Sequence, residues 1–189
     1  DQLSSFVDWN DRRSCILFGD GAGALAIEAT NDFDNLLGFD MKTDGGRGSF
    51  LNLPSIDNKN SIIDNIDFLN GGFSSIQMNG QEVYKFAVRE VPIILDNLFR
   101  KTNYCSEKVD WLVLHQANQR ILDAVGDRLK IPREKILSNL AKYGNTSAAT
   151  IPLMLDESIR NNRIHQNDII ATSGFGAGLS WGAALIKWG

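Results

Sequence analysis

The sequence predicts an α/β protein in which helices layer against a sheet of mixed strand order. The first observation is alternation, because short apolar, β-rich runs are separated by segments with the apolar spacing of amphipathic helices. The second is an internal similarity: "ILFGDGAGALAIEA" and "ATSGFGAGLSWGAALIKW" share one pattern of apolar run, G-x-G-x-G and apolar run. If both segments are equivalent hairpins, the chain holds one copy of a repeated α/β unit and only the end of another.

Strands and turns are expected before residue 51, and an irregular region after it. Residues 14–29 have the pattern of a strand, a glycine-rich turn and a second strand. A loop over 30–35, a short strand over 36–43 and a turn over 44–50 follow. Residues 52–77 are rich in Asn and Ser, with scattered apolar side chains, and are expected to be irregular.

Helical spacing begins at Asn79. Asn79 and Glu82 form a capping-box pattern, and apolar residues then recur at intervals of three and four as far as Leu98. Pro92 lies within this helix and is expected to kink it. The remaining expected elements are a strand over 110–114, a helix over 118–130, a turn over 131–136, a helix from about Ser147 to Arg160, and strands over 168–173 and 179–188.

The composition is that of an ordinary globular protein, with 43% hydrophobic and 22% charged residues. A net charge of −4 without any Lys/Arg run argues against nucleic-acid binding, and the apolar runs are too short for a membrane span. Cys15 and Cys105 have no metal-ligand spacing, so no metal site is predicted and a reducing compartment is expected. The chain begins without Met or a targeting pattern, which favours a processed or truncated polypeptide.

The two glycine motifs do not predict a nucleotide site. A dinucleotide fingerprint needs a helix directly after its glycines, whereas both motifs here are followed by strand-like runs. For "GDGAG" (residues 19–23) a tight hairpin with closely approaching backbones is the favoured interpretation. "GFGAG" (residues 174–178) can instead expose backbone N–H groups to a developing oxyanion.

Two polar residues are candidates for catalysis. His115 follows the apolar run "WLVL" and precedes a helix, a common place for active-site groups in α/β proteins. The alternative is a half-buried imidazole with a structural hydrogen bond. Asn145, in "KYGNTSAAT", is a candidate amide donor, but it could equally stand in a turn before an N-cap at Thr146 or Ser147. No nucleophile is recognised in the chain.

The motifs "LHQAN", "YGNTSAAT" and "GFGAGLSWGAAL", in this order, resemble those of β-ketoacyl-acyl-carrier-protein synthase III. "FGDGAGALA" and "NGQEVYKFAV" fit the same family, so the resemblance covers the whole chain. It implies a thiolase-like fold of two similar α/β halves with mixed sheets and layered helices. Residues 1–38 would be the tail of the N-terminal half, with its closing hairpin, and residues 39–189 the C-terminal half.

The resemblance also implies a reaction. The family uses a Cys-His-Asn triad, of which His115 and Asn145 match the last two members, while the cysteine is absent here. An acyl-CoA primer loads the cysteine, and malonyl-acyl-carrier protein then loses CO₂ and attacks the acyl group in a decarboxylating Claisen condensation that initiates fatty acid synthesis. His115 and Asn145 are expected to be neutral donors to the enolate. This chain alone is therefore expected to be inactive.

Further residues are matched to the family less firmly. Phe175 matches a phenylalanine beside the cysteine, and Gly176 and Ala177 belong to the oxyanion turn, where the Ala177 N–H is the expected donor. The residues matched to CoA or carrier-protein binding are Arg12, Lys85, Ala117, Asn118, Arg120 and Arg128. A solvated helix face is the alternative for the basic ones, and Asp127 stands where a basic residue is common, which weakens the patch.

Two other functions remain open at this stage. One is a type III polyketide synthase, which also uses Cys-His-Asn, although "SWG" and "HQAN" favour synthase III. The other is a non-catalytic acyl-carrier-binding subunit, which would need neither His115 nor Asn145. The expected partners are acyl carrier protein and a second copy of the protein, with acyl-CoA as substrate and no permanently bound cofactor. The expected location is the cytoplasm or the plastid stroma.

Overall fold

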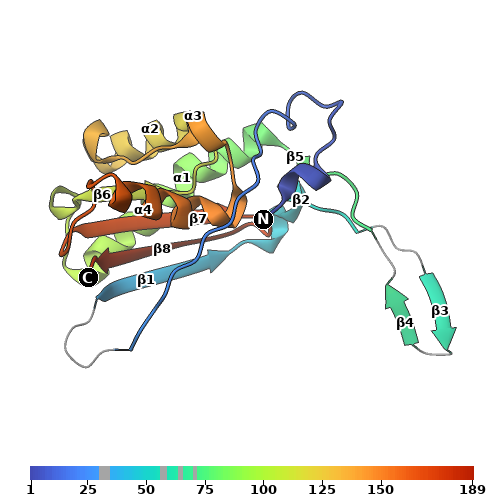
Figure 1. Cartoon of the computed structure of the whole chain (residues 1–189), viewed down its shortest axis with the longest axis horizontal. Coiled ribbons are helices and arrows are strands. Elements are labelled where there is room, and N and C mark those ends of the chain that lie inside the picture. The colour runs from blue at the N-terminus through green and yellow to red at the C-terminus, as the bar shows by residue number, and fades with distance from the viewer. Residues whose placement is uncertain (30–34, 56–58, 64–65, 70–71) are drawn as a thin grey trace.

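A mixed four-stranded sheet forms the centre of the chain. The computed structural model describes residues 1–29, 35–55, 59–63, 66–69 and 72–189. The sheet has the order β1-β8-β7-β6, from β1 (Leu36–Thr43), β6 (Trp111–Leu114), β7 (Ile169–Gly176) and β8 (Ser180–Lys187) (Figure 1). β8 is antiparallel to both neighbours, and β6 is parallel to β7. The mixed strand order predicted from the sequence is confirmed.

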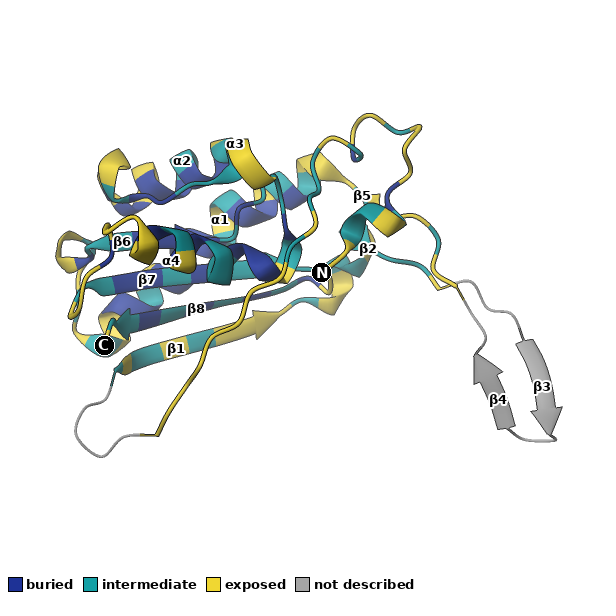
Figure 2. Ribbon diagram, in the orientation of Figure 1, coloured by how far each residue is buried: buried dark blue, intermediate teal, exposed yellow. Residues whose placement is uncertain are grey.

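Helices cover both faces of this sheet. α1 (Gly80–Thr102) and α2 (Gln119–Leu129) pack together on one face, and α4 (Thr150–Arg160) packs on the other. Leu112 and Leu114 belong to the apolar cluster under α1 and α2, whereas Val113 belongs to the cluster under α4. Successive strand residues point to opposite faces, so β6 is buried on both (Figure 2). This rigid strand carries the chain to His115.

At the N-terminus of α1, only one of the two hydrogen bonds of the predicted capping box forms. The Asn79 side chain accepts a hydrogen bond from the Glu82 N–H at 3.3 Å, as expected of an N-cap. The reciprocal bond is replaced, because the Asn79 N–H donates to Phe50 O and the Glu82 carboxylate pairs with Lys85 at 2.7 Å. α1 continues through Pro92 without a break, and a kink there stays a prediction.

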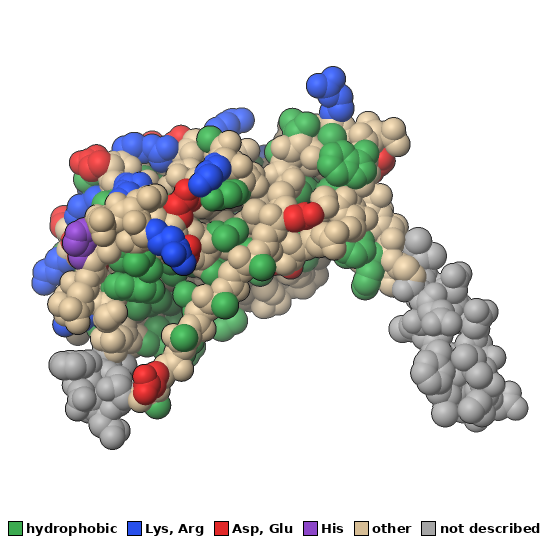
Figure 3. Space-filling model, viewed as in Figure 1, with side chains coloured by type: hydrophobic (Ala, Val, Ile, Leu, Met, Phe, Trp, Pro, Cys, Tyr) green, Lys and Arg blue, Asp and Glu red, His purple; other side chains and the backbone are tan. Residues whose placement is uncertain are grey.

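Residues 14–29 do not form the predicted strand–turn–strand. They contain turns, a single bridge from Phe18 to Asn145 in which the Gly19 N–H donates to Asn145 O, and then chain that pairs with no strand among the described residues. Leu25 and Ile27 are 53% and 94% exposed, and hydrophobic side chains are visible along this segment in Figure 3. The prediction was wrong because alternation of apolar residues indicates a strand but does not provide the neighbouring strand that it needs.

Other parts of the first 77 residues also differ from expectation. Residues 52–77 are not wholly irregular, since short antiparallel pairs join β2 (Leu51–Asn52) to β5 (Gln77–Met78) and β3 (Lys59–Ile63) to β4 (Ile66–Leu69). Strands this short show no recognisable periodicity. The turn over 44–50 contains a 3-10 helix, Gly45–Phe50, capped by Asp44. Most of the loop predicted over 30–35 lies outside the described residues, and the division into domains at 38/39 stays a prediction.

The elements from residue 110 to the end of the chain agree closely with the prediction. The strands and helices expected from residue 110 onward are present, with boundaries shifted by a few residues. α3 (Leu140–Tyr143) was not predicted, and the helix expected from Ser147 begins as a 3-10 helix, Ser147–Ala149. Further 3-10 helices are Leu3–Phe6, Ser106–Lys108 and Arg133–Lys135. No helix among the described residues combines the length and apolarity that crossing a bilayer would require.

Gly126 tests the packing of α2. A Cβ added there would lie 2.2 Å from Cδ1 of Ile136, a buried residue of the core. We expect Gly126→Ala to lower the free energy of unfolding of the chain by roughly 1–3 kcal/mol, because overpacking outweighs the gain in helix propensity. Urea unfolding measures this difference. Ile136→Val removes the clashing methyl, so the double variant should lose about 1 kcal/mol less than the two single changes together; strictly additive losses would contradict the account.

Candidate active site

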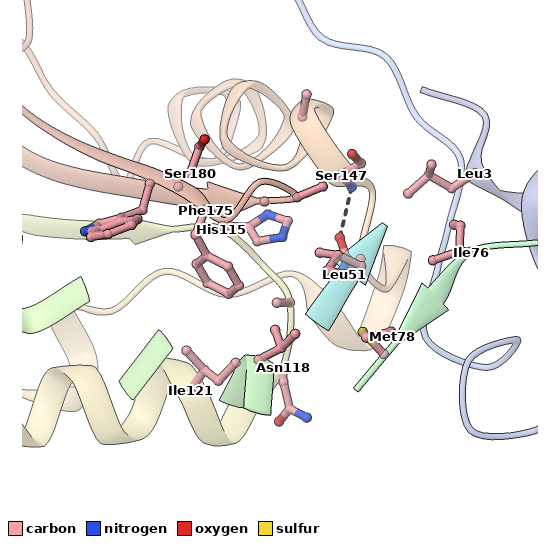
Figure 4. Close-up of a pocket in the computed structure, with 18 of the residues that line it drawn as sticks. Leu3, Leu51, Ile76, Met78, His115, Asn118, Ile121, Ser147, Phe175 and Ser180 are labelled. Atoms are coloured by element: carbon pink, nitrogen blue, oxygen red, sulfur yellow. Dashed lines mark hydrogen bonds between the residues drawn. The ribbon is translucent and has the colours of Figure 1, made fainter. Parts of the chain in front are cut away.

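A cavity of about 620 Å³ lies where β6 and β7 end. His115 and Phe175 project into it from these strand ends, while Leu51 and Met78 contribute apolar side chains from β2 and β5 (Figure 4). Seven residues expected at the site line this cavity: His115, Ala117, Asn118, Asn145, Phe175, Gly176 and Ala177. The fold therefore brings together His115 and Asn145, which are 30 residues apart in the sequence.

The backbone of His115 is fixed by the sheet. Its N–H donates to Ser173 O at 2.9 Å, which continues the parallel pairing of β6 with β7 by one residue. The ring of Phe175 meets the imidazole edge-on, with 5.0 Å between ring centroids and an angle of 86° between planes. Phe175 in turn packs against Phe86 of α1. The imidazole is therefore held between a strand end and an aromatic ring that is itself anchored in the core.

Gln116 holds the chain directly after His115. This residue is completely buried, and its side-chain amide donates to Leu114 O at 2.9 Å and to Leu137 O at 3.2 Å. Its carbonyl oxygen accepts from the Asn139 N–H at 3.1 Å. A buried amide with all of these bonds fixes the turn after β6. Sequence reasoning missed this role, because a Gln in a polar stretch gives no sign that it is buried.

The imidazole of His115 is neutral in this environment. Burial among the cavity walls lowers the pKa of His115 from 6.5 to about 4. Its Nδ1 lies 3.1 Å from Oγ1 of Thr150, the first residue of α4. Thr150 is 2% exposed. Thr150 belongs to a quoted motif, but nothing in the sequence indicated a contact with a residue 35 positions earlier.

The backbone of Asn145 is held by the N-terminal segment. Its N–H donates to Leu17 O at 2.9 Å, and its carbonyl oxygen accepts from the Gly19 N–H at 2.8 Å. A Cβ on Gly19 would lie 2.1 Å from Tyr143 O, so only glycine allows the two backbones to approach this closely. The hairpin predicted for "GDGAG" is not formed, and the close backbone approach of Gly19 is instead made to this loop.

The side chain of Asn145 is oriented by Ser147. Its Oδ1 accepts the Ser147 N–H at 2.9 Å, the bond drawn as a dashed line in Figure 4. With the oxygen engaged, the amide Nδ2 is left as the donor group on the cavity wall. Thr146 stands at the N-cap position of the following 3-10 helix without a side-chain capping bond. Thr146 thus has the N-cap position that the alternative gave it, but its side chain makes no capping bond.

The predicted basic residues are not part of the described cavity lining. All four of these residues are exposed: Arg12, Lys85, Arg120 and Arg128. Lys85 is paired with Glu82 at 2.7 Å, and the Arg120 guanidinium lies 5.1 Å from the ring centre of Tyr84. The last three of the four are on α1 and α2, which pack together. Their roles in binding CoA or a carrier protein stay predictions.

Neither cysteine belongs to the cavity. Cys15 is half-buried and Cys105 is exposed, and neither is part of the described lining. Among the residues that the structure describes, no group of three or more His, Cys, Asp or Glu side chains is placed to hold a metal ion. The site residues that line this cavity offer hydrogen bonds from an imidazole, an amide and backbone N–H groups.

The lowered pKa of His115 predicts a titration. The imidazole Cε1–H signal, identified by its loss in His115→Gln, should titrate in an NMR experiment near pH 4 rather than near 6.5. Between these values the unfolded chain binds a proton that the folded chain does not. Stability is therefore complete above about pH 6.5 and falls as the pH drops towards 4, by about 2 kcal/mol at pH 5. A midpoint near 6.5 would contradict the burial argument.

Comparison with known proteins agrees with the motifs. Residues 1–45 match the family model described as 3-oxoacyl-[acyl-carrier-protein] synthase III, and residues 99–188 match the model of its C-terminal part. The chain is 90% identical over its 189 residues to β-ketoacyl-[acyl-carrier-protein] synthase III of Prochlorococcus marinus and covers 56% of that protein. It therefore spans about half the length of the curated relatives it matches.

Solved structures of the same family share this fold. The synthase III of Pseudomonas aeruginosa matches with a TM-score of 0.89 and 34% identity, over 100% of this chain and 56% of that one. The synthase III of Aquifex aeolicus matches with a TM-score of 0.87 and 37% identity, over 99% of this chain and 55% of that one. The expected thiolase-like α/β fold is confirmed. The chain belongs to the 3-oxoacyl-[acyl-carrier-protein] synthase III family and corresponds to the C-terminal part of its members.

Proposed function

We propose that the protein containing this chain is an acyltransferase that initiates fatty acid synthesis. It condenses an acyl-CoA primer with malonyl-acyl-carrier protein, with loss of CO₂, and forms a β-ketoacyl-acyl-carrier protein. Family membership supports this reaction. The observation that carries the proposal is the cavity, in which Asn145, with its oxygen engaged by Ser147, shares a wall with the neutral His115.

The residue types suit the decarboxylation step. Loss of CO₂ from a malonyl thioester moves negative charge onto the thioester oxygen, and preorganised neutral donors stabilise this enolate. Asn145 donates from Nδ2, because its oxygen is engaged. His115 acts through Nε2, because Nδ1 is engaged by Thr150. A neutral imidazole is too weak an acid to protonate the carbanion readily, so the nucleophile survives to attack the acyl group.

The β7–β8 turn suits the second oxyanion of the reaction. In the proposal, the backbone N–H of Ala177 stabilises the oxyanion formed when the acyl thioester is attacked. Ala177 and Gly176 line the same cavity as His115, and the ring of Phe175 packs nearly perpendicular to the imidazole. The acylated cysteine would come from the part of the protein that this chain does not span.

The proposal includes substrates, partners and a location. Acyl-CoA binds as a substrate, with Ala117 and Asn118 on the cavity wall and Arg12 at the adenine. Acyl carrier protein meets the basic residues of α1 and α2, and the protein acts as a homodimer without a permanently bound cofactor. The cytoplasm is the proposed location, because the Prochlorococcus marinus relatives come from a bacterium. A non-catalytic subunit is disfavoured, since it would need neither Asn145 nor His115.

Removal of His115 tests the assigned step. In the full-length protein we expect His115→Ala to slow malonyl decarboxylation by about 10²–10³-fold, the usual loss for one oxyanion donor, while acyl loading of the cysteine survives. Release of labelled CO₂ from malonyl-acyl-carrier protein measures the first step, and mass spectrometry of the acyl thioester measures the second. His165→Ala is the matched control, because His165 is exposed and lies outside the described cavity lining. Undiminished decarboxylation in His115→Ala would remove His115 from this role.

A further inference from the structure

The buried hydroxyl of Thr150 lies between the imidazole of His115 and the backbone of Ser147. Oγ1 of Thr150 is 3.1 Å from Nδ1 of His115, and the same hydroxyl donates to Ser147 O. Thr150 is 2% exposed, so bulk water does not compete for these bonds. It makes no contact with the substrate in the proposed reaction, and no motif assigned it a role.

These two bonds fix the positions of the protons. A carbonyl oxygen has no hydrogen, so the hydrogen between Thr150 and Ser147 belongs to the threonine hydroxyl. A hydroxyl has only one hydrogen, so the hydrogen between Thr150 and His115 must sit on Nδ1. A neutral imidazole carries a single N–H. Nε2 of His115 therefore has a lone pair in this arrangement.

We propose that Thr150 is a positioning residue that sets the tautomer of His115. At rest its hydroxyl faces Ser147 O, and His115 is held as the Nδ1–H tautomer with an accepting Nε2. The inference rests on the proposed function, in which His115 must later donate a hydrogen bond to the enolate. Donation from Nε2 requires the opposite tautomer, and Thr150 is placed to support that form as well.

The second tautomer costs the protein one hydrogen bond and leaves no carbonyl without a donor. Ser147 O also accepts the backbone N–H of Thr150, so this carbonyl stays bonded when the hydroxyl turns away. The turned hydroxyl then donates to Nδ1 of His115. While the hydroxyl turns, the ring releases its Nδ1 proton to water in the cavity and takes one from that water at Nε2, so its net charge does not change. A valine at position 150 could support neither arrangement, whereas a serine could support both.

The tautomer can be read directly by NMR. We would label histidine with ¹⁵N in the full-length protein, record long-range ¹H–¹⁵N correlations, and identify His115 by its loss in His115→Gln. The expected result is an Nδ1–H tautomer in the wild type and in Thr150→Ser. In Thr150→Val we expect a shift to the Nε2–H tautomer that a histidine side chain favours in water. An unchanged tautomer in Thr150→Val, with the fold intact by circular dichroism, would overturn the inference.

A second measurement tests the reversal. On addition of a malonyl-thioester analogue that cannot lose CO₂, the wild-type signal should change from the Nδ1–H to the Nε2–H pattern, and Thr150→Ser should behave in the same way. A wild-type ring that stays Nδ1–H with the analogue bound would contradict the two-way role of Thr150. The tautomer is read without turnover. Failure of this inference is therefore distinct from failure of the proposed function, which the decarboxylation rate of His115→Ala decides.

Discussion

The candidate site depends on the backbone of Ser147. Its N–H binds Oδ1 of Asn145, and its carbonyl oxygen accepts the hydroxyl of Thr150, which in turn contacts Nδ1 of His115. Ser147 has a φ of 53°, in the left-handed region, and this turn directs the two backbone groups towards different partners. One residue thereby orients the side chains of both candidate catalytic groups.

The rest of the fold holds the two sides of this arrangement in place. The pairing of β6 with β7 continues to His115, and Gln116 ties the following turn to neighbouring backbone. On the other side, the segment at Leu17 pairs with Asn145 through a bridge that requires a glycine beside it. Burial of the imidazole keeps it neutral, so His115 provides a hydrogen bond rather than a fixed charge.

The sequence predicted those features that depend on local pattern. The stripe on α1 has clear periodicity, β6 is a continuous apolar run, the β7–β8 hairpin has a glycine-rich turn between apolar runs, and the motifs identified His115 and Asn145. The sequence could not show contacts between distant segments, such as Thr150 with His115. The prediction for residues 14–29 was wrong, because a strand pattern forms a strand only beside a partner, and Ile27 has no such partner in the part of the chain that the structure describes.

The central claim is that His115 and Asn145 act on one developing oxyanion. A crystal structure of the full-length protein with a malonyl-thioester analogue that cannot lose CO₂ tests this claim most directly. The account predicts the thioester oxygen at about 2.7–3.1 Å from both Nε2 of His115 and Nδ2 of Asn145. A thioester oxygen bound elsewhere, with neither nitrogen within hydrogen-bonding distance, would contradict it.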